Sequence, residues 1–354
     1  GMDRGVGMDT VLIHELERVV CKNVDLYRHF SDKTILVTGA TGLIGSMLIK
    51  SMLMANRLLS TDIKIIGHVR DIDKARQLYW DMYNNDRLTC TTEALSCINE
   101  SIDYIVHTAS PTQSKYFVEN PVETLHASIG NTVDCLELSR RTNIIKMLYL
   151  SSMEQYGIQL VDNQQMTEAD LGYINHLDVR SSYSEGKRIC ECYCNAYAEE
   201  YGVPVTIARL AQTFGPGIPV EDNRVSMQFA KSVLNCSDIV LHTKGESISN
   251  FCYIMDALTA LLVLLKYGES CEAYNICNAK ETRSIYEIAC LVADEVANGE
   301  ISVKFDIPTV NNYGYAPTVK YFLNTDKLEN LGWKAEIGMK EAYRLLIEYL
   351  KDND

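Results

Sequence analysis

The sequence is short of positive charge. Its 33 lysine and arginine residues stand against 47 aspartate and glutamate residues, which gives a formal net charge of −14 at pH 7. Proteins that bind DNA or RNA use clustered lysine and arginine side chains to displace the counterions of the phosphate backbone. The deficit argues against a nucleic-acid partner, and we expect the protein to act on a small molecule.

Long apolar runs and paired cysteines are missing too. A membrane-spanning helix needs about 18–20 apolar residues, and the longest candidate, residues 257–265, is much shorter. The start of the sequence has no secretory hydrophobic segment. The twelve cysteines lack the C-x-x-C pairs of metal sites. We therefore expect no membrane contact, no metal ion, reduced cysteines and a cytoplasmic location.

Apolar strands alternate with helical patterns in the first two-thirds of the sequence. The expected strands are residues 33–38, 62–69, 102–107, 145–151 and 205–209, and the expected helices include 46–59, 121–141 and 183–201. This alternation predicts an α/β fold with a Rossmann-type, doubly wound parallel sheet.

The alternation becomes irregular after residue 214, which predicts a second region. We expect an N-terminal helical extension at residues 1–30 and a nucleotide-binding domain formed by residues 31–214 with 251–279. A smaller, discontinuous C-terminal α/β lobe for the substrate would comprise residues 215–250 with 280–354.

A glycine-rich segment, residues 39–45, is expected as a loop between the first strand and the first helix of the sheet. Gly39 would permit a tight turn, Gly42 a close approach to pyrophosphate, and Gly45 the packing of helix on strand. The start of the helix adds free N–H groups and a partial positive charge. The sequence therefore predicts an NAD or NADP site at Gly39, Thr41, Gly42, Leu43, Ile44 and Gly45.

The end of the second expected strand bears on the choice of cofactor. NAD enzymes usually place an acidic residue there to bind the ribose 2′-hydroxyl. The sequence has Arg70 followed by Asp71. Arg70 could pair with a 2′-phosphate and favours NADP, whereas Asp71 leaves NAD open.

Candidate catalytic groups occur in two further segments. Tyr183 and Lys187 are four residues apart, so a helix would place them on one face. A neighbouring ammonium group favours the phenolate form of a tyrosine, which suits a general base. Ser152 follows a predicted core strand, at the edge where parallel α/β sheets hold their ligands.

Together these segments resemble the extended short-chain dehydrogenase/reductase family, the epimerase and dehydratase type that acts on nucleotide sugars. The resemblance extends over most of residues 33–350 and is closest in motif to UDP-glucuronate decarboxylases. Besides the segments above it includes His107-Thr108-Ala109-Ser110-Pro111, Asn120-Pro121-Val122-Glu123-Thr124, Phe214-Gly215-Pro216 and Leu331-Gly332-Trp333.

The resemblance implies a role for each candidate residue. Tyr183 would be the catalytic base, with Lys187, Ser152 and Glu154 as its partners. Further cofactor contacts would come from Thr108, Ala109 and Ser110. The substrate would meet Ser110, Gln212, Arg224 and Ser249. The implied reaction oxidises the sugar at C4 to a transient 4-keto sugar by hydride transfer to NAD(P).

Departures from the family pattern concern the substrate. At the position of Ser249 the family usually has an arginine that grips the diphosphate, and serine cannot replace a bidentate guanidinium. We consider Arg224 or Lys244 as sources of the missing charge. Met153 stands where family dehydratases have an acid, which argues against a 4,6-dehydratase.

Three hypotheses of function follow. The first is a nucleotide-sugar epimerase or decarboxylase, and the second is an NADP-dependent reductase or dehydrogenase of a carbonyl or alcohol without a diphosphate. The third is a catalytically silent cofactor-binding protein. The resemblance also implies a homodimer formed by the helix after Pro121 and the helix of Tyr183.

Overall fold

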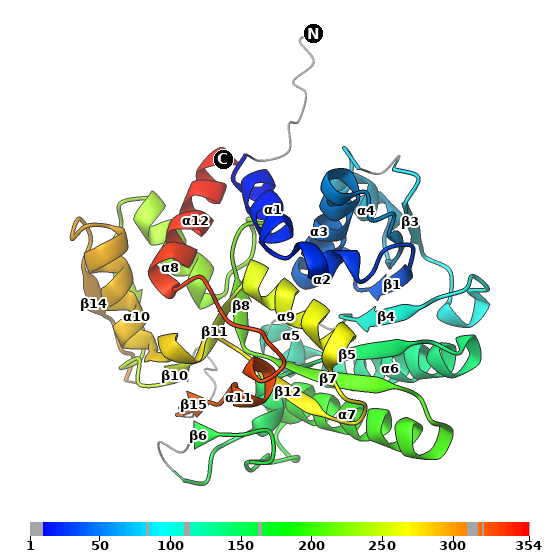
Figure 1. The fold of residues 1–354 in the computed structure, drawn as a ribbon. Coiled ribbons are helices and arrows are strands. Elements are labelled where there is room, and N and C mark those ends of the chain that lie inside the picture. Colours follow the sequence, from blue (N-terminus) through cyan, green and yellow to red (C-terminus); the bar gives the residue numbers. More distant parts are fainter. Residues whose placement is uncertain are drawn as a thin grey trace.

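The apolar strand segments assemble side by side into one parallel sheet (Figure 1). In this computed structural model, residues 10–82, 85–109, 114–161, 165–309, 318–320 and 322–353 are described. The strands of the sheet are β1 (Thr34–Thr38), β2 (Lys64–His68), β3 (Leu88–Thr91), β4 (Tyr104–His107), β5 (Lys146–Ser152), β7 (Val205–Leu210) and β12 (Ala273–Ile276). Their order, β12-β7-β5-β4-β1-β2-β3, reverses direction beside β1, so the expected Rossmann-type, doubly wound sheet is confirmed.

Helices cover both faces of the sheet. Between and around the strands of the sheet lie α3 (Leu43–Leu59), α4 (Ile72–Leu78), α5 (Ser114–Glu119), α6 (Pro121–Thr142), α7 (Ser182–Tyr201) and α9 (Ile254–Tyr267). Helices α6 and α7 pack on each other against one face, while α3 and α9 pack together on the other (Figure 1). The result is a three-layer α/β body.

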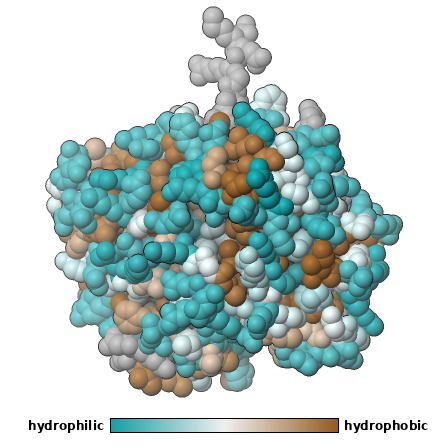
Figure 2. Space-filling view, in the orientation of Figure 1, coloured by the Kyte–Doolittle hydropathy of each residue, from teal (hydrophilic) through white to brown (hydrophobic). Residues whose placement is uncertain are grey.

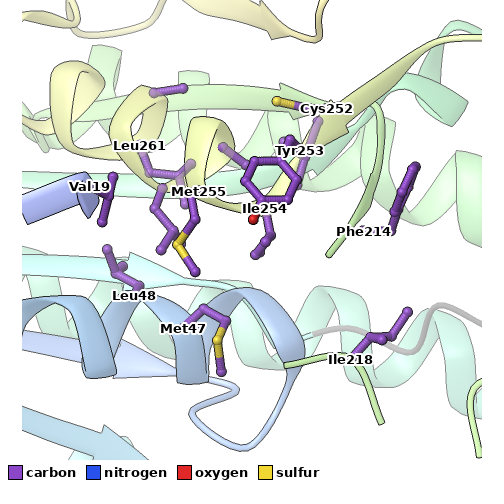
Figure 3. Close-up of a cluster of buried hydrophobic side chains, with 14 of the residues drawn as sticks. Val19, Met47, Leu48, Phe214, Ile218, Cys252, Tyr253, Ile254, Met255 and Leu261 are labelled. Atoms are coloured by element: carbon purple, nitrogen blue, oxygen red, sulfur yellow. The ribbon is translucent and has the colours of Figure 1, made fainter. Parts of the chain in front are cut away.

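The side chains of β1 show how the two faces are filled. Ile35 and Val37 belong to the cluster under α3 and α9, whereas Leu36 belongs to the cluster under α6 and α7. Successive side chains of a strand point to opposite faces, so a strand buried on both sides is apolar at every position. Figure 3 shows the first cluster, in which Met47 and Leu48 of α3 face Met255 and Leu261 of α9.

Two N-terminal helices, α1 (Thr10–Lys22) and α2 (Val24–Arg28), extend this cluster. Helix α1 has an apolar stripe that includes Leu16 and Val19 and packs against α3, α9 and the C-terminal helix α12 (Met339–Asp352). A buried carboxylate, Glu15, accepts hydrogen bonds from Tyr253 Oη at 2.5 Å and from Arg18. The N-terminal helix is thus bonded to residues far along the chain.

The remaining elements are short and gather beside the carboxyl end of the sheet. They are β6 (Gln165–Met166), β8 (Gln212–Phe214), α8 (Val225–Leu234), β9 (Ile239–Leu241), β10 (Ile248–Ser249), β11 (Phe251–Tyr253), β13 (Arg283–Ser284), α10 (Ile285–Leu291), β14 (Val303–Phe305), β15 (Phe322–Leu323) and α11 (Asp326–Glu329). Their strands form the two-stranded pairs β6–β15, β8–β11, β9–β14 and β10–β13, and β8 follows β7 after a single residue.

Several boundaries differ from the sequence expectation by one to three residues, and two of these differences have a clear local cause. Helix α3 begins at Leu43 instead of Ser46, because Gly42 has the extended backbone of a helix N-cap and the helix starts directly after it. The expected loop 39–45 is therefore only residues 39–42. Strand β2 is shorter than residues 62–69, since Asp62 has a left-handed backbone (φ 58°) that a strand does not accommodate.

On the face drawn in Figure 2, hydrophobic residues are scattered among hydrophilic ones. Among the described residues, no helix is long and apolar enough to cross a membrane. Within the same residues, no group of three or more histidine, cysteine, aspartate or glutamate side chains is arranged to hold a metal ion.

Candidate active site

The glycine segment, residues 39–45, forms a tight turn, here called the cradle, that packs too closely on neighbouring protein atoms to allow side chains at Gly39 and Gly45. Gly39 has φ +61°, and a Cβ added to it would lie 2.7 Å from Thr108 Oγ1. A Cβ on Gly45 would lie 2.4 Å from the carbonyl oxygen of Gly39. Both contacts are shorter than real Cβ atoms tolerate, so glycine is required at each position. A tight glycine turn of this kind, followed directly by a helix, is the arrangement that dinucleotide sites use to bring backbone close to the pyrophosphate.

The start of α3 is open to an anion. Its N-cap, Gly42, makes no side-chain capping bond, so the first N–H groups of a 17-residue helix are left to a ligand. The predicted contacts Thr41, Leu43 and Ile44 surround this point and are partly exposed. This end of the helix has the geometry of a phosphate site.

Buried polar bonds hold the cradle against β4. His107 Nδ1 lies 2.6 Å from Thr38 Oγ1, and burial lowers the pKa of His107 to about 3, so its ring is neutral. Thr108 donates from Oγ1 to the carbonyl of Thr38 at 2.6 Å. Ala109 is partly exposed beside them, whereas Ser110 lies outside the described residues.

The two residues proposed to choose between cofactors are exposed at the end of β2. Asp71 is the N-cap of α4, and its Oδ1 accepts from the backbone N–H groups of Asp73 and Lys74 at 3.0 and 3.2 Å. This carboxylate oxygen of Asp71 is therefore already hydrogen-bonded within the protein. Arg70 makes no hydrogen bond or ion pair to the described residues.

The carboxyl end of β5 supplies two of the predicted catalytic groups. Ser152 is the N-cap of a short 3-10 helix, η2 (Met153–Tyr156), and its Oγ accepts from the backbone N–H of Glu154 at 3.1 Å. Both side chains are partly exposed. Burial raises the pKa of the Glu154 carboxyl, and the positive charge of Lys187 opposes this.

Helix α7 brings the other two groups to the same place. Lys187 is 4% exposed, and its Nζ donates to the carbonyl of Leu150 at 2.9 Å. The same Nζ lies 5.6 Å from the ring centroid of Tyr183, one turn earlier on the helix. Burial lowers the pKa of Lys187 to about 8, while neighbouring Glu191 and Glu154 raise it. Ser152, Glu154, Tyr183 and Lys187 are thus brought together.

An ion pair that the sequence analysis missed fixes α7 to the sheet. Arg209 Nη2 lies 2.7 Å from Glu191 Oε1, and both side chains are nearly buried. Glu191 Oε2 also accepts from Ser151 Oγ at 2.6 Å, beside Ser152. Glu191 follows Lys187 by one helical turn, and this spacing together with a polar residue inside β7 is the signal that could have revealed the pair.

On the substrate side, the predicted residues are less closely gathered. Gln212 begins β8, two residues past the end of β7, and is exposed. Ser249 is partly exposed in β10. Arg224 precedes α8, and its guanidinium pairs with Asp222 at 3.1 Å. Lys244 is exposed before β10.

Comparison with known proteins gives consistent matches. The model of the NAD dependent epimerase/dehydratase family matches residues 35–277, more than half of the chain. UDP-glucuronic acid decarboxylase 6 of Arabidopsis thaliana is 29% identical over 321 residues, covering 90% of this chain and 89% of that protein. UDP-glucuronic acid decarboxylase 1 of Xenopus tropicalis is 30% identical over 295 residues, covering 82% and 68%.

Solved structures share the fold. UDP-glucose 4-epimerase of Thermotoga maritima, solved with UDP-glucose, has a TM-score of 0.74 at 20% identity, covering 90% of this chain and 99% of its own. UDP-glucuronic acid 4-epimerase of Bacillus cereus, solved with UDP-glucuronic acid and NAD, also has a TM-score of 0.74 at 20% identity, with 91% and 100% coverage. With its cradle, its Tyr183–Lys187 helix face and these matches, the chain belongs to the NAD-dependent epimerase/dehydratase family of enzymes.

Proposed function

We propose that the protein converts a nucleotide-diphosphate sugar through a transient 4-keto sugar, and that it is an epimerase or a decarboxylase. The observation that carries the proposal is the gathering of Ser152, Tyr183 and Lys187 at the carboxyl edge of the sheet that also bears the glycine cradle. The decarboxylase relatives and the epimerase structures support the substrate class.

The dinucleotide would be held by residues of the cradle and of α7. Its pyrophosphate would meet the backbone of Gly39, Gly42 and Leu43 at the start of α3, and its nicotinamide ribose would meet Lys187 and Tyr183. When bound, the nicotinamide group accepts a hydride from the sugar carbon and later returns one. In the sheet, β1 and β5 are separated only by β4, so the two parts lie about 10 Å apart.

Proton transfer is the task of the protein's own side chains. Tyr183, as phenolate, takes the proton of the C4 hydroxyl when the C4–H bond is broken, and returns it when the ketone is reduced. The ammonium of Lys187 supports the phenolate. Ser152 can hydrogen-bond the reacting oxygen, because its hydroxyl can donate while accepting from the backbone.

The residues beside Ser152 bear on what happens to the ketone. Glu154 is the only carboxylate of η2 and keeps its proton to a higher pH than an ordinary glutamate. Met153 cannot donate a proton, so the pair of acids that a 4,6-dehydratase uses is absent from η2. Epimerisation at C4 needs no second acid. In a 4-keto uronic acid the C5–C6 bond can break to release CO₂, its electron pair passes to the C4 oxygen as an enolate, and C5 then takes up a proton from Glu154 or from water.

For the cofactor we propose NADP in preference to NAD. Asp71 already uses one carboxylate oxygen to cap α4, and Arg70 is exposed beside it, where a 2′-phosphate would be paired. Comparing Kd for NADP⁺ and NAD⁺ tests this choice, and tighter binding of NAD⁺ would refute it.

Two further properties remain proposals. The protein is proposed to act in the cytoplasm, in keeping with its reduced cysteines. A homodimer is proposed to form through α6 and α7, which lie side by side on one face (Figure 1). Sedimentation would test the dimer, and a monomer at micromolar concentration would refute it.

The second candidate function is NADP-dependent reduction of a carbonyl without a diphosphate, favoured by the uncharged Ser249 in β10. One experiment separates the two functions. The protein is incubated with UDP-, dTDP-, CDP- and GDP-sugars, and the products and co-purified cofactor are identified by mass spectrometry. Turnover without net NADPH consumption supports the proposal. No turnover of any nucleotide sugar, with NADPH-dependent reduction of simple carbonyls, would refute it.

A further inference from the structure

A nucleotide-diphosphate sugar brings two negative charges into a protein that is itself strongly acidic. Binding that group requires a fixed cation, and arginine is the side chain best matched to phosphate oxygens. Ser249 provides none in β10. The following inference rests on the proposed function and concerns which residue binds the diphosphate.

The strand paired with β10 carries an arginine at the facing position. Strands β10 and β13 are antiparallel, with Ser249 opposite Arg283 and Ile248 opposite Ser284. Directly opposite residues of an antiparallel pair project from the same face, with Cβ atoms about 4.5–5.5 Å apart. The side chain of Arg283 therefore leaves the strand pair on the face to which Ser249 belongs.

The strand pair lies close to the catalytic edge of the sheet. Ser152 at the end of β5 is level with Leu210 at the end of β7, and β8 begins two residues later. Gln212 of β8 donates its N–H to the carbonyl of Asn250 at 3.1 Å, directly after Ser249. Only a few residues therefore separate the reacting groups from the end of β10. This arrangement suits a substrate whose sugar lies at the reacting groups and whose diphosphate lies at β10.

The guanidinium of Arg283 is arranged to receive an anion. Its Nε donates to Glu281 Oε2 at 3.2 Å, and both side chains are partly exposed. Neither terminal nitrogen makes a hydrogen bond to any described residue. A carboxylate on Nε fixes the plane of the group and leaves both terminal nitrogens for bidentate contact with phosphate.

The two other cations considered for this role are placed less well. Gly245 accepts from the N–H of Tyr286, so Lys244 lies at the end of the strand pair that points away from Gln212. Arg224 pairs through its Nε with Asp222 much as Arg283 pairs with Glu281, but Arg224 precedes α8 and does not belong to the strand pair that contains Ser249.

We propose that Arg283 of β13 binds the diphosphate of the nucleotide substrate, in the place of an arginine that β10 lacks. The positive charge that binds the diphosphate would thus be carried by β13, at the residue opposite Ser249, and not by β10.

Binding of UDP, measured by calorimetry, tests the proposal in the full-length protein. Arg283→Ala is expected to weaken UDP binding about 10- to 100-fold, because two charge-assisted hydrogen bonds are lost. Binding of NADP⁺ should be unchanged, which shows that the variant is folded. Arg87→Ala, which removes a partly exposed arginine just before β3 that pairs with Asp62, should bind UDP like the wild type.

A second variant tests the facing position directly. Adding Ser249→Arg to Arg283→Ala returns a guanidinium to the same face from the other strand, and should recover at least 10-fold of the lost affinity. Wild-type UDP affinity in Arg283→Ala, or failure of the added arginine to restore binding, would overturn the assignment of the diphosphate to Arg283. Neither result would bear on the proposed function. If the wild type binds no nucleoside diphosphate while it binds NADP⁺, the proposed function fails as well.

Discussion

Replacing Lys187 with methionine is expected to stabilise the protein while it abolishes activity. Burial lowers the pKa of Lys187 from 10.5 to about 8. Each pH unit of such a difference corresponds to about 1.4 kcal/mol, so holding the buried ammonium at pH 7 costs about 3 kcal/mol. The hydrogen bond to Leu150 returns about 1 kcal/mol. Lys187→Met should therefore raise the free energy of unfolding by about 2 kcal/mol at pH 7.

The pH dependence distinguishes this explanation from better packing. Between pH 8 and 10.5 unfolded Lys187 still binds a proton and folded Lys187 does not, so the wild type gains stability as the pH rises. The advantage of Lys187→Met should almost vanish by pH 9.5, as measured by urea unfolding. Lys64→Met, at an exposed lysine, should change stability by less than about 0.5 kcal/mol. A variant less stable than the wild type at pH 7, or an advantage independent of pH, would refute the reasoning.

Three other changes have defined outcomes. Tyr183→Phe should lower kcat about 10²- to 10⁴-fold, whereas Tyr201→Phe on the same helix should keep full activity. An equal loss of kcat in both variants would disprove the role of Tyr183 as the catalytic base. Gly45→Ala should weaken dinucleotide binding at least about 10-fold, since its Cβ would meet a carbonyl oxygen, and unchanged calorimetric affinity would contradict the cradle. Asp256→Asn should stabilise the protein by about 1–2 kcal/mol at pH 7.5, because burial raises the pKa of Asp256 to about 6. The backbone N–H groups of Glu336 and Ile337 both donate to Oδ2 of Asp256, so the single amide oxygen of asparagine can accept both. As the pH falls towards 4, folded Asp256 takes up a proton and the advantage of the variant should disappear. If the advantage persists at pH 4, the buried carboxylate charge of Asp256 is not its cause.

Strong periodic segments made most of the sheet predictable. The strands that became β1, β4, β5 and β7 are apolar at more than half of their positions and buried at nearly every one, as expected of strands covered on both faces. The helix of Tyr183 was placed within one residue of its start, because its apolar positions recur at helical spacing. Local patterns of this kind need no knowledge of distant residues.

Features that depend on distant pairing were not predictable. Strand β12 contains only four residues and joins the sheet because β7 offers it a free edge. The helical start at Leu43 depended on a backbone angle of Gly42 that other residues could also adopt. Arg283 attracts no attention in the sequence, because its position opposite Ser249 exists only once β10 and β13 pair. Propensity carries no information on such a register.

The contacts of α1 have a consequence for biosynthesis. This helix is synthesised well before its partners α9 and α12, and Glu15 has no hydroxyl from Tyr253 until the chain has been made beyond residue 253. Some 330 residues separate α1 from the end of α12, and at 5–20 residues per second their synthesis takes on the order of tens of seconds. Until α9 is made, the apolar stripe of α1 has only α2 and α3 of its partner helices to cover it, so the packing of α1 is completed long after the helix itself is synthesised.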